Sequence, residues 1–139
     1  SPQDRLNMLK LALKEYPAFL ISEYEINKKD ISYSIHTIQY FKKTLPKAKL
    51  FYLIGGDNVD EFSSWKNSED ILKLAKVVVY DRDNCIKQQL GKFEFVKSPL
   101  IDISSSEIRE CVKTHTPYKN FLHPAVFDYI KKNKLYTSM

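Results

Sequence analysis

A serine-rich segment holds the densest group of residues that could do chemistry. Ser104, Ser105 and Ser106 stand at the start of a predicted helix whose inward positions are Ile108 and Val112, and Arg109 follows within it. A helix start offers free N–H groups and about half a positive charge, and an arginine can pair with phosphate oxygens through two hydrogen bonds. The pattern predicts a phosphate-binding site. A capping box between Ser104 and Glu107, beside an exposed arginine, explains the same spacing equally well.

A second candidate follows an apolar run. The five residues Leu50–Ile54 are all apolar or aromatic and stop at Gly55-Gly56-Asp57. A short apolar run that ends in glycine is typical of a strand buried on both faces of a parallel sheet. Glycines there let the backbone approach a ligand at the carboxyl end of the strand, where open α/β sheets bind their ligands. The alternative is a plain turn into a helix, with Asp57 as its N-cap.

The single tryptophan is the third candidate. Trp65 has Ser63-Ser64 before it and Lys66-Asn67 after it, and these polar neighbours favour a partly exposed ring that could stack on a ligand. The alternative is a tryptophan of the core. The three histidines, His36, His115 and His123, stand in no recognisable catalytic setting.

The elements that must position these residues alternate between helices and strands. Helical spacing, with proline or serine at the starts, predicts helices at 1–16, within 32–45 with Ile35, Ile38, Phe41 and Leu45 inward, at 68–75, after Ser104, and after the N-cap and N1 pair His123-Pro124. Apolar runs predict strands at 19–22, 50–54, 76–80 and 93–96. Such alternation implies right-handed crossovers and a mostly parallel α/β sheet. Because the chain opens on a helix, we expect the first strand of that sheet to be missing from it.

Composition limits the possible partners. A chain of 139 residues with 43% hydrophobic and 28% charged residues is expected to form a single soluble domain, 1–139. The net charge of +5 comes from scattered lysines, which argues against a nucleic-acid groove. Cys85 and Cys111 show neither metal nor redox spacing, there is no signal peptide, and no apolar run reaches the ~20 residues of a membrane span. We therefore expect a cytoplasmic protein that binds no membrane.

Five segments, in order, resemble one family. Ile103-Ser-Ser-Ser-Glu-Ile-Arg109 resembles the I-S-S-T-x-I-R signature of the nucleotidyltransferase superfamily, with Ser106 in place of the threonine. Four more segments resemble bacterial nicotinate-nucleotide adenylyltransferases: Ser32–Ile38 (S-Y-T-x-x-T-L), Ile54–Asp57 with Trp65 (I-G-x-D…W), Val77–Arg82, and Leu122–Tyr136 (L-P-x-x-V-x-x-Y-I…L-Y). The family's G-x-F-x-P-x-H-x-G-H loop, which carries its catalytic histidines, does not occur in these 139 residues.

The resemblance implies a fold and a reaction. The fold is the Rossmann-like nucleotidyltransferase fold, an open, mostly parallel sheet flanked by helices, here without its first strand and helix. The reaction is transfer of the adenylyl group of ATP to nicotinate mononucleotide. Without the histidine loop we expect this chain alone to be inactive. A nucleotide-binding module without catalysis, or a transferase for another phosphorylated acceptor, remains the alternative.

The resemblance also implies residue roles. ATP phosphates would contact Ser104, Ser105, Ser106, Arg109 and Arg82; a ribose hydroxyl would contact the Gly55-Gly56-Asp57 turn; nicotinate would contact Tyr33, Ser34, Trp65 and Lys66. Magnesium would arrive with ATP and not on dedicated protein ligands. The partners would be these small nucleotides. Oligomeric state and the preference for nicotinate over nicotinamide stay open.

Overall fold

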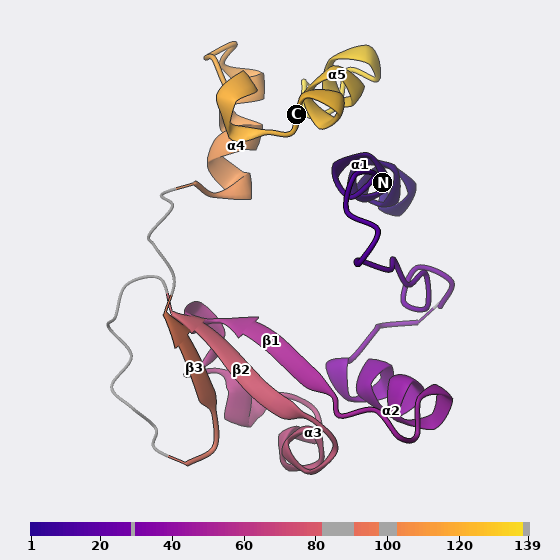
Figure 1. Ribbon diagram of the computed structural model, residues 1–139. Helices are drawn as coiled ribbons and strands as arrows, with labels where there is room; N and C mark the ends of the chain where they lie inside the picture. Colours follow the sequence, from indigo (N-terminus) through magenta and orange to yellow (C-terminus); the bar gives the residue numbers. More distant parts are fainter. Residues whose placement is uncertain (29, 82–90, 98–102, 138–139) are drawn as a thin grey trace. The chain divides into compact units, whose positions relative to one another are not determined.

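The computed structural model describes residues 1–28, 30–81, 91–97 and 103–137 (Figure 1). The chain divides into two compact units, one made of residues 24–101 and the other of residues 1–23 with 102–139. Each unit has a hydrophobic cluster of its own. A single domain over 1–139 stays a prediction.

The unit of residues 24–101 contains a three-stranded parallel sheet. Its strands are β1 (Phe51–Gly55), β2 (Lys76–Asp81) and β3 (Glu94–Lys97), in the order β1-β2-β3 (Figure 1). Helix α2 (Ser34–Thr44) precedes β1, and α3 (Ser68–Leu74) joins β1 to β2. Two short 3-10 turns, η1 (Gly56–Asn58) and η2 (Phe62–Ser64), lie between β1 and α3. The predicted parallel α/β architecture is confirmed, with three of the four predicted strands in place to within one residue.

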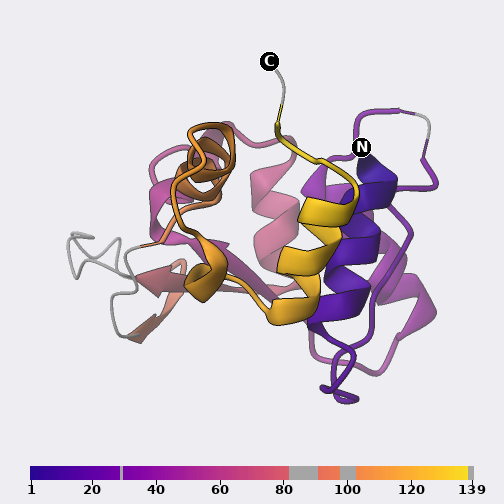
Figure 2. The same cartoon turned by 90° about the horizontal axis from the view of Figure 1, so that it is seen from above.

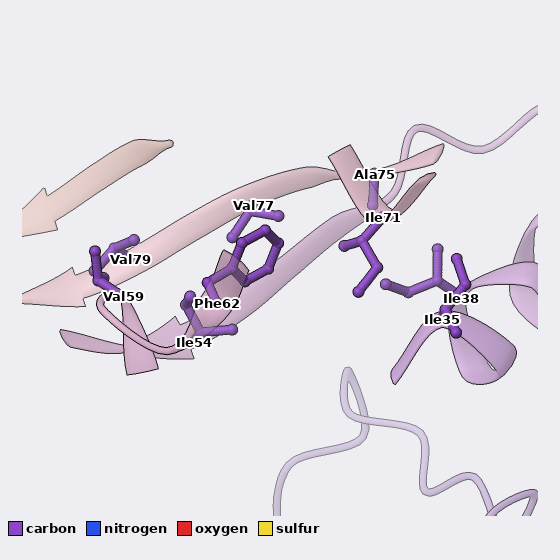
Figure 3. Packing of buried hydrophobic residues seen from close by; sticks show 9 residues of the cluster. All are labelled: Ile35, Ile38, Ile54, Val59, Phe62, Ile71, Ala75, Val77 and Val79. Atoms are coloured by element: carbon purple, nitrogen blue, oxygen red, sulfur yellow. The ribbon is translucent and has the colours of Figure 1, made fainter. Parts of the chain in front are cut away.

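The core of this unit lies between one face of the sheet and the helices. Figure 3 shows Ile54 of β1 with Val77 and Val79 of β2 and the ring of Phe62, while Ile71 of α3 faces α2. Val79 and Ile71 are both completely buried. Full burial of an aliphatic side chain contributes about 1.5–3 kcal/mol, so this cluster holds β1, β2 and the two helices in register.

Burial of β1 on both faces was expected, and this is wrong for the described chain. Side chains alternate along β1: Ile54 is buried, whereas Phe51 and Leu53 are 58% and 64% exposed. Leu45, predicted to point inward, is 51% exposed because α2 ends at Thr44. An uninterrupted apolar run does not show whether one face of a strand or both are covered.

The other unit is helical in its described part. It contains α1 (Pro2–Ala12), α4 (Ser105–Lys113), the 3-10 turn η3 (Lys119–Phe121) and α5 (Pro124–Lys132). Helices α1 and α5 lie side by side (Figure 2). Their cluster is built on Val112, Val126 and Ile130, with Met8, Leu11 and Leu135 packed against it.

Helix starts in this unit follow the predicted caps. Ser1 forms a capping box with Asp4, and the ring Nδ1 of His123 accepts a 3.3 Å hydrogen bond from the Ala125 N–H. The Tyr129 hydroxyl of α5 donates to Asp4 of α1 at 3.0 Å and accepts from Asn7 at 2.9 Å. These two bonds tie α5 to α1.

Two predictions for residues 13–22 are wrong. Helix α1 ends at Ala12 and not at Tyr16, since the chain forms turns from Leu13 onward. Residues Phe19–Ser22 form no strand, and Leu20 is 95% exposed. A strand needs a neighbouring strand for its hydrogen bonds, and this segment belongs to the unit without the sheet.

Within the described ranges, no helix has both the length and the apolarity that crossing a membrane requires.

Candidate functional site

One pocket of the sheet-bearing unit brings together the four residues predicted to bind nicotinate. It has a volume of about 270 Å³ and is lined by Ser32, Tyr33, Ser34, Ser64, Trp65, Lys66 and Ile71. Tyr33 and Ser34 come from the start of α2, and Trp65 and Lys66 directly follow η2. Two segments that lie about thirty residues apart in the sequence therefore meet at one pocket. Small molecules usually bind in such concave sites.

The start of α2 supplies the polar wall of this pocket. Tyr33 is the N-cap, in an extended conformation, and makes no side-chain capping bond. Ser34 is the first helical residue, and its hydroxyl accepts a 2.8 Å hydrogen bond from Tyr52 of β1. The first amides of a helix have no acceptor within it and lie at its positive end. This wall therefore suits an anionic group.

Trp65 provides the aromatic wall. Its ring lies 5.3 Å from Phe62 at an interplanar angle of 41°, and 6.4 Å from Tyr52 in an edge-to-face arrangement. The residue is partly buried, packed against the core cluster while it lines the pocket. The prediction of a partly exposed ring is confirmed, and its position suits stacking on a flat ligand.

Lys66 adds the charge. Its Nζ lies 4.3 Å from the centroid of the Tyr33 ring, at cation–π distance, and the Tyr33 ring in turn meets His36 edge-to-face at 5.7 Å. None of the seven described residues that line the pocket is acidic. The pocket thus combines a helix start, an ammonium group and an indole ring.

The glycine turn lies at the carboxyl end of β1. Asp57 is exposed in η1, and its carboxylate accepts a 3.1 Å hydrogen bond from the Asn58 amide group. A Cβ on Gly55 would collide with Asp57 Oδ1, so this glycine makes room for the carboxylate. The N-cap of η1 is Gly55, so the alternative that made Asp57 an N-cap is wrong. Asp57 remains available for a hydroxyl ligand.

The serine-rich helix start is both capped and open. The capping box is present: the Ser104 N–H donates to Glu107 at 2.8 Å and the Glu107 N–H donates to Ser104 Oγ at 3.1 Å. Hydrogen bonds from the Ser104 side chain and from its backbone N–H to the Glu107 carboxylate hold the pKa of Glu107 below its ordinary value. The first helical amides, those of Ser105 and Ser106, are not used by the cap. Both interpretations of this segment can therefore hold together.

Arg109 lies on the same face as these serines. Its Nη2 donates to Ser106 Oγ at 2.9 Å, and both residues are exposed, as is Ser105. The guanidinium thus stays within reach of a group held at the helix start. Arg82 lies outside the described residues.

Sequence reasoning missed Tyr52. It was counted only as part of an apolar strand, yet its hydroxyl bonds Ser34 and its ring meets Trp65. Alternation along β1 could have found it, because Tyr52 shares a face with the buried Ile54. Three residues that do line the pocket, Ser32, Ser64 and Ile71, were missed as well.

The described residues include no group of three histidine, cysteine or acidic side chains placed to hold a metal ion. The donors at the start of α4 are hydroxyls, amides and a guanidinium, which suit phosphate oxygens and not a cation. That magnesium arrives with ATP stays a prediction.

Comparisons with known proteins agree with this picture. The family model described as "Cytidylyltransferase-like" matches residues 1–111. A "Probable nicotinate-nucleotide adenylyltransferase" of Methylacidiphilum infernorum is 38% identical over 138 residues, which cover 98% of this chain and 68% of the relative. One of the same name from Aquifex aeolicus is 42% identical over 120 residues, covering 77% of this chain and 71% of the relative.

A solved structure shows the same fold. The nicotinic acid mononucleotide adenylyltransferase of Plasmodium falciparum, complexed with NaAD, matches with a TM-score of 0.76 at 20% identity, covering 96% of this chain and 73% of that one. By its family model and its curated relatives, this chain belongs to the cytidylyltransferase-like family and, within it, to the nicotinate-nucleotide adenylyltransferases.

Proposed function

We propose that this chain binds ATP and nicotinate mononucleotide and belongs to an enzyme that transfers the adenylyl group of ATP to nicotinate mononucleotide. The products are nicotinate adenine dinucleotide and pyrophosphate, and the reaction is a step of NAD biosynthesis. The observation that carries the proposal is the pocket in which Trp65, Lys66 and the start of α2 meet, in a chain whose relatives bear the name of this enzyme.

The pocket would hold the nicotinate ring and its carboxylate. The ring would stack on Trp65, whose orientation Phe62 and Tyr52 hold. The carboxylate would accept hydrogen bonds from the backbone amides near Ser34 and Lys66, at the positive end of α2. Tyr33 would close the pocket beside Lys66.

ATP would be held by groups that favour anions and hydroxyls. Ser104, Ser105, Ser106 and Arg109 would contact its phosphates, and Asp57 a ribose hydroxyl. Arg82 belongs to the same proposal, without a structural argument. Magnesium would neutralise phosphate charge when bound with ATP.

The reaction needs alignment more than covalent help. A phosphate oxygen of nicotinate mononucleotide attacks the α-phosphorus of ATP, a new P–O bond forms, and the bond to the β-phosphate oxygen breaks with release of pyrophosphate. No oxidant or reductant takes part. Donors placed where negative charge grows, such as Arg109, lower the barrier.

A transfer assay tests the proposal. The 139-residue chain, and the chain preceded by a histidine-bearing loop of the family pattern, are each incubated with ATP or CTP and with nicotinate mononucleotide, its amide or phosphopantetheine. We expect the extended chain to form nicotinate adenine dinucleotide from ATP, and the chain alone to bind without turnover. Transfer only to another acceptor, or no transfer by either form, would contradict the proposal. Cytoplasmic location stays a prediction.

A further inference from the structure

The helical unit has a cavity of its own, formed where α4 and α5 end. Its volume is about 450 Å³, within the 300–1,000 Å³ range of small-molecule sites. Val112, Ile130 and Leu135 supply apolar surface, and the rings of Tyr118 and Phe127, 5.1 Å apart, supply aromatic surface. No residue assigned above to either nucleotide lines it.

Three lysines give this cavity a positive rim. Lys119, Lys131 and Lys134 line it, and the Nζ atoms of Lys119 and Lys131 lie 5.9 and 5.5 Å from the centroid of the Phe127 ring. No acidic side chain is among the described lining residues. Across the described ranges, the recorded ion pairs involve other lysines, so these charges are not neutralised by a carboxylate within 4 Å.

The backbone at the rim is held in an unfavourable conformation. His115 (φ 55°) and Lys134 (φ 49°) each follow directly after the C-cap residue of a helix, Thr114 and Asn133 respectively, and both line the cavity. Glycine is the usual residue at such a left-handed helix end, because a Cβ is strained there. Here both positions keep long polar side chains. Both side chains therefore lie at the rim of the cavity, although glycine would fit the backbone better at these positions.

We propose that this cavity binds a small anion that carries a flat apolar body, such as an aromatic carboxylate or phosphate. The body lies against Phe127 and Tyr118, over Val112 and Ile130. The anionic group accepts hydrogen bonds from Lys131 and Lys134 at the rim. This site is separate from the proposed nicotinate pocket, which belongs to the other unit, and it does not depend on adenylyl transfer.

Naphthyl phosphate is a suitable probe, and nuclear magnetic resonance of the full ¹⁵N-labelled chain locates it. We expect saturable shifts at His115, Tyr118 and Phe127, and weaker binding of neutral naphthol. Lys131→Gln should weaken the binding of naphthyl phosphate by about tenfold, which is the effect expected from the loss of one charge-assisted hydrogen bond. Lys132→Gln is the matched control, because it removes the same charge from the next position of α5 without touching the cavity.

Three results would overturn the proposal. The first is the absence of binding. The second is a set of shifts centred on Ser104–Arg109 or Trp65, which would assign the probe to the nucleotide contacts proposed above. The third is an equal loss from Lys131→Gln and Lys132→Gln, which would show only general attraction to a basic surface. Arg109→Ala should leave naphthyl phosphate binding unchanged.

Discussion

At the scale of single residues, the ammonium group of Lys66 supplies the positive charge of the pocket that we propose binds nicotinate. We predict that Lys66→Met weakens the binding of nicotinate mononucleotide several-fold and leaves the binding of nicotinamide mononucleotide nearly unchanged. Only nicotinate mononucleotide presents a carboxylate to the Lys66 Nζ, which lies over the Tyr33 ring. Titration calorimetry with both nucleotides measures the ratio. Lys28→Met is the control, since its Nζ lies 4.4 Å from the ring of Tyr24 but outside the pocket. Equal losses for both nucleotides would restrict Lys66 to a structural role.

Arg109 gives the second residue-scale prediction. Arg109→Ala should weaken the binding of ATP about tenfold or more, since charge-assisted hydrogen bonds contribute roughly 1.5–3 kcal/mol each. The affinity for nicotinate mononucleotide should not change. Ser104→Ala removes the N-cap together with a proposed phosphate contact, so this variant should also lose about 1 kcal/mol of stability, which Arg109→Ala should not. Binding isotherms and thermal unfolding of both variants measure these effects. Unchanged ATP affinity in Arg109→Ala would exclude a contact between Arg109 and the ATP phosphates.

At this scale the sequence predicted residue types better than contacts. Ser104 with Glu107 is readable because a capping box is local, and the structure contains it. Alternation along β1 places Tyr52 on the face of the buried Ile54, but its contacts with Ser34 and Trp65 could not be predicted by spacing, since these partners come from other segments. Local patterns are visible in one segment, whereas a pocket requires knowledge of which segments meet.

At the scale of elements, the left-handed ends of α4 and α5 make a prediction about stability. His115→Gly and Lys134→Gly should each stabilise the chain, because left-handed backbone costs an ordinary residue roughly 1–2 kcal/mol more than glycine and the flexibility of glycine offsets part of that gain. Thermal unfolding measures the shift. Thr114→Gly is the control: its φ is −85°, so glycine there should destabilise. A fall in melting temperature for both left-handed positions would show that their side chains hold the fold.

Element boundaries were predictable where the signal was local. β2 and α3 lie within one residue of their predictions, because an apolar valine run and an acidic first turn mark them. The segment Phe19–Ser22 had the composition of a strand but forms none. Strand formation is decided by pairing, which a single segment does not reveal.

At the scale of the whole molecule, acid should destabilise the chain. The Ser1 and Tyr129 hydroxyls lower the pKa of Asp4, and Lys73, Lys76 and the Ser104 cap lower the pKa of Asp70, Glu94 and Glu107 respectively. A folded-state pKa below the unfolded value means that the unfolded chain binds more protons. Stability therefore rises with pH through this range and is lost as pH falls below about 4–5.

Urea unfolding at several pH values measures this dependence. We expect the urea concentration at the unfolding midpoint to decrease as the pH is lowered from about 5 to about 3. Asp4→Asn should make this dependence on pH weaker, since Asp4 links α1 to Tyr129 of α5. Asp128→Asn, at an exposed position of α5, serves as the comparison. A wild-type midpoint independent of pH over this interval would show that these carboxylates are equally protonated in both states.

We propose that the pocket at Trp65 holds the nicotinate ring, and tryptophan fluorescence tests this claim directly because the chain contains one tryptophan. Nicotinate mononucleotide should quench the emission saturably, and nicotinamide mononucleotide should do so only at higher concentration. Trp65→Phe should bind several-fold more weakly by calorimetry and Trp65→Ala more weakly still, since stacking contributes about 0.5–1.5 kcal/mol beyond area burial. ATP affinity should barely change in either variant. A purely structural tryptophan would instead cost roughly 3–5 kcal/mol of stability in Trp65→Ala and weaken both ligands together. That outcome, or emission that does not respond to nicotinate mononucleotide, would contradict the claim.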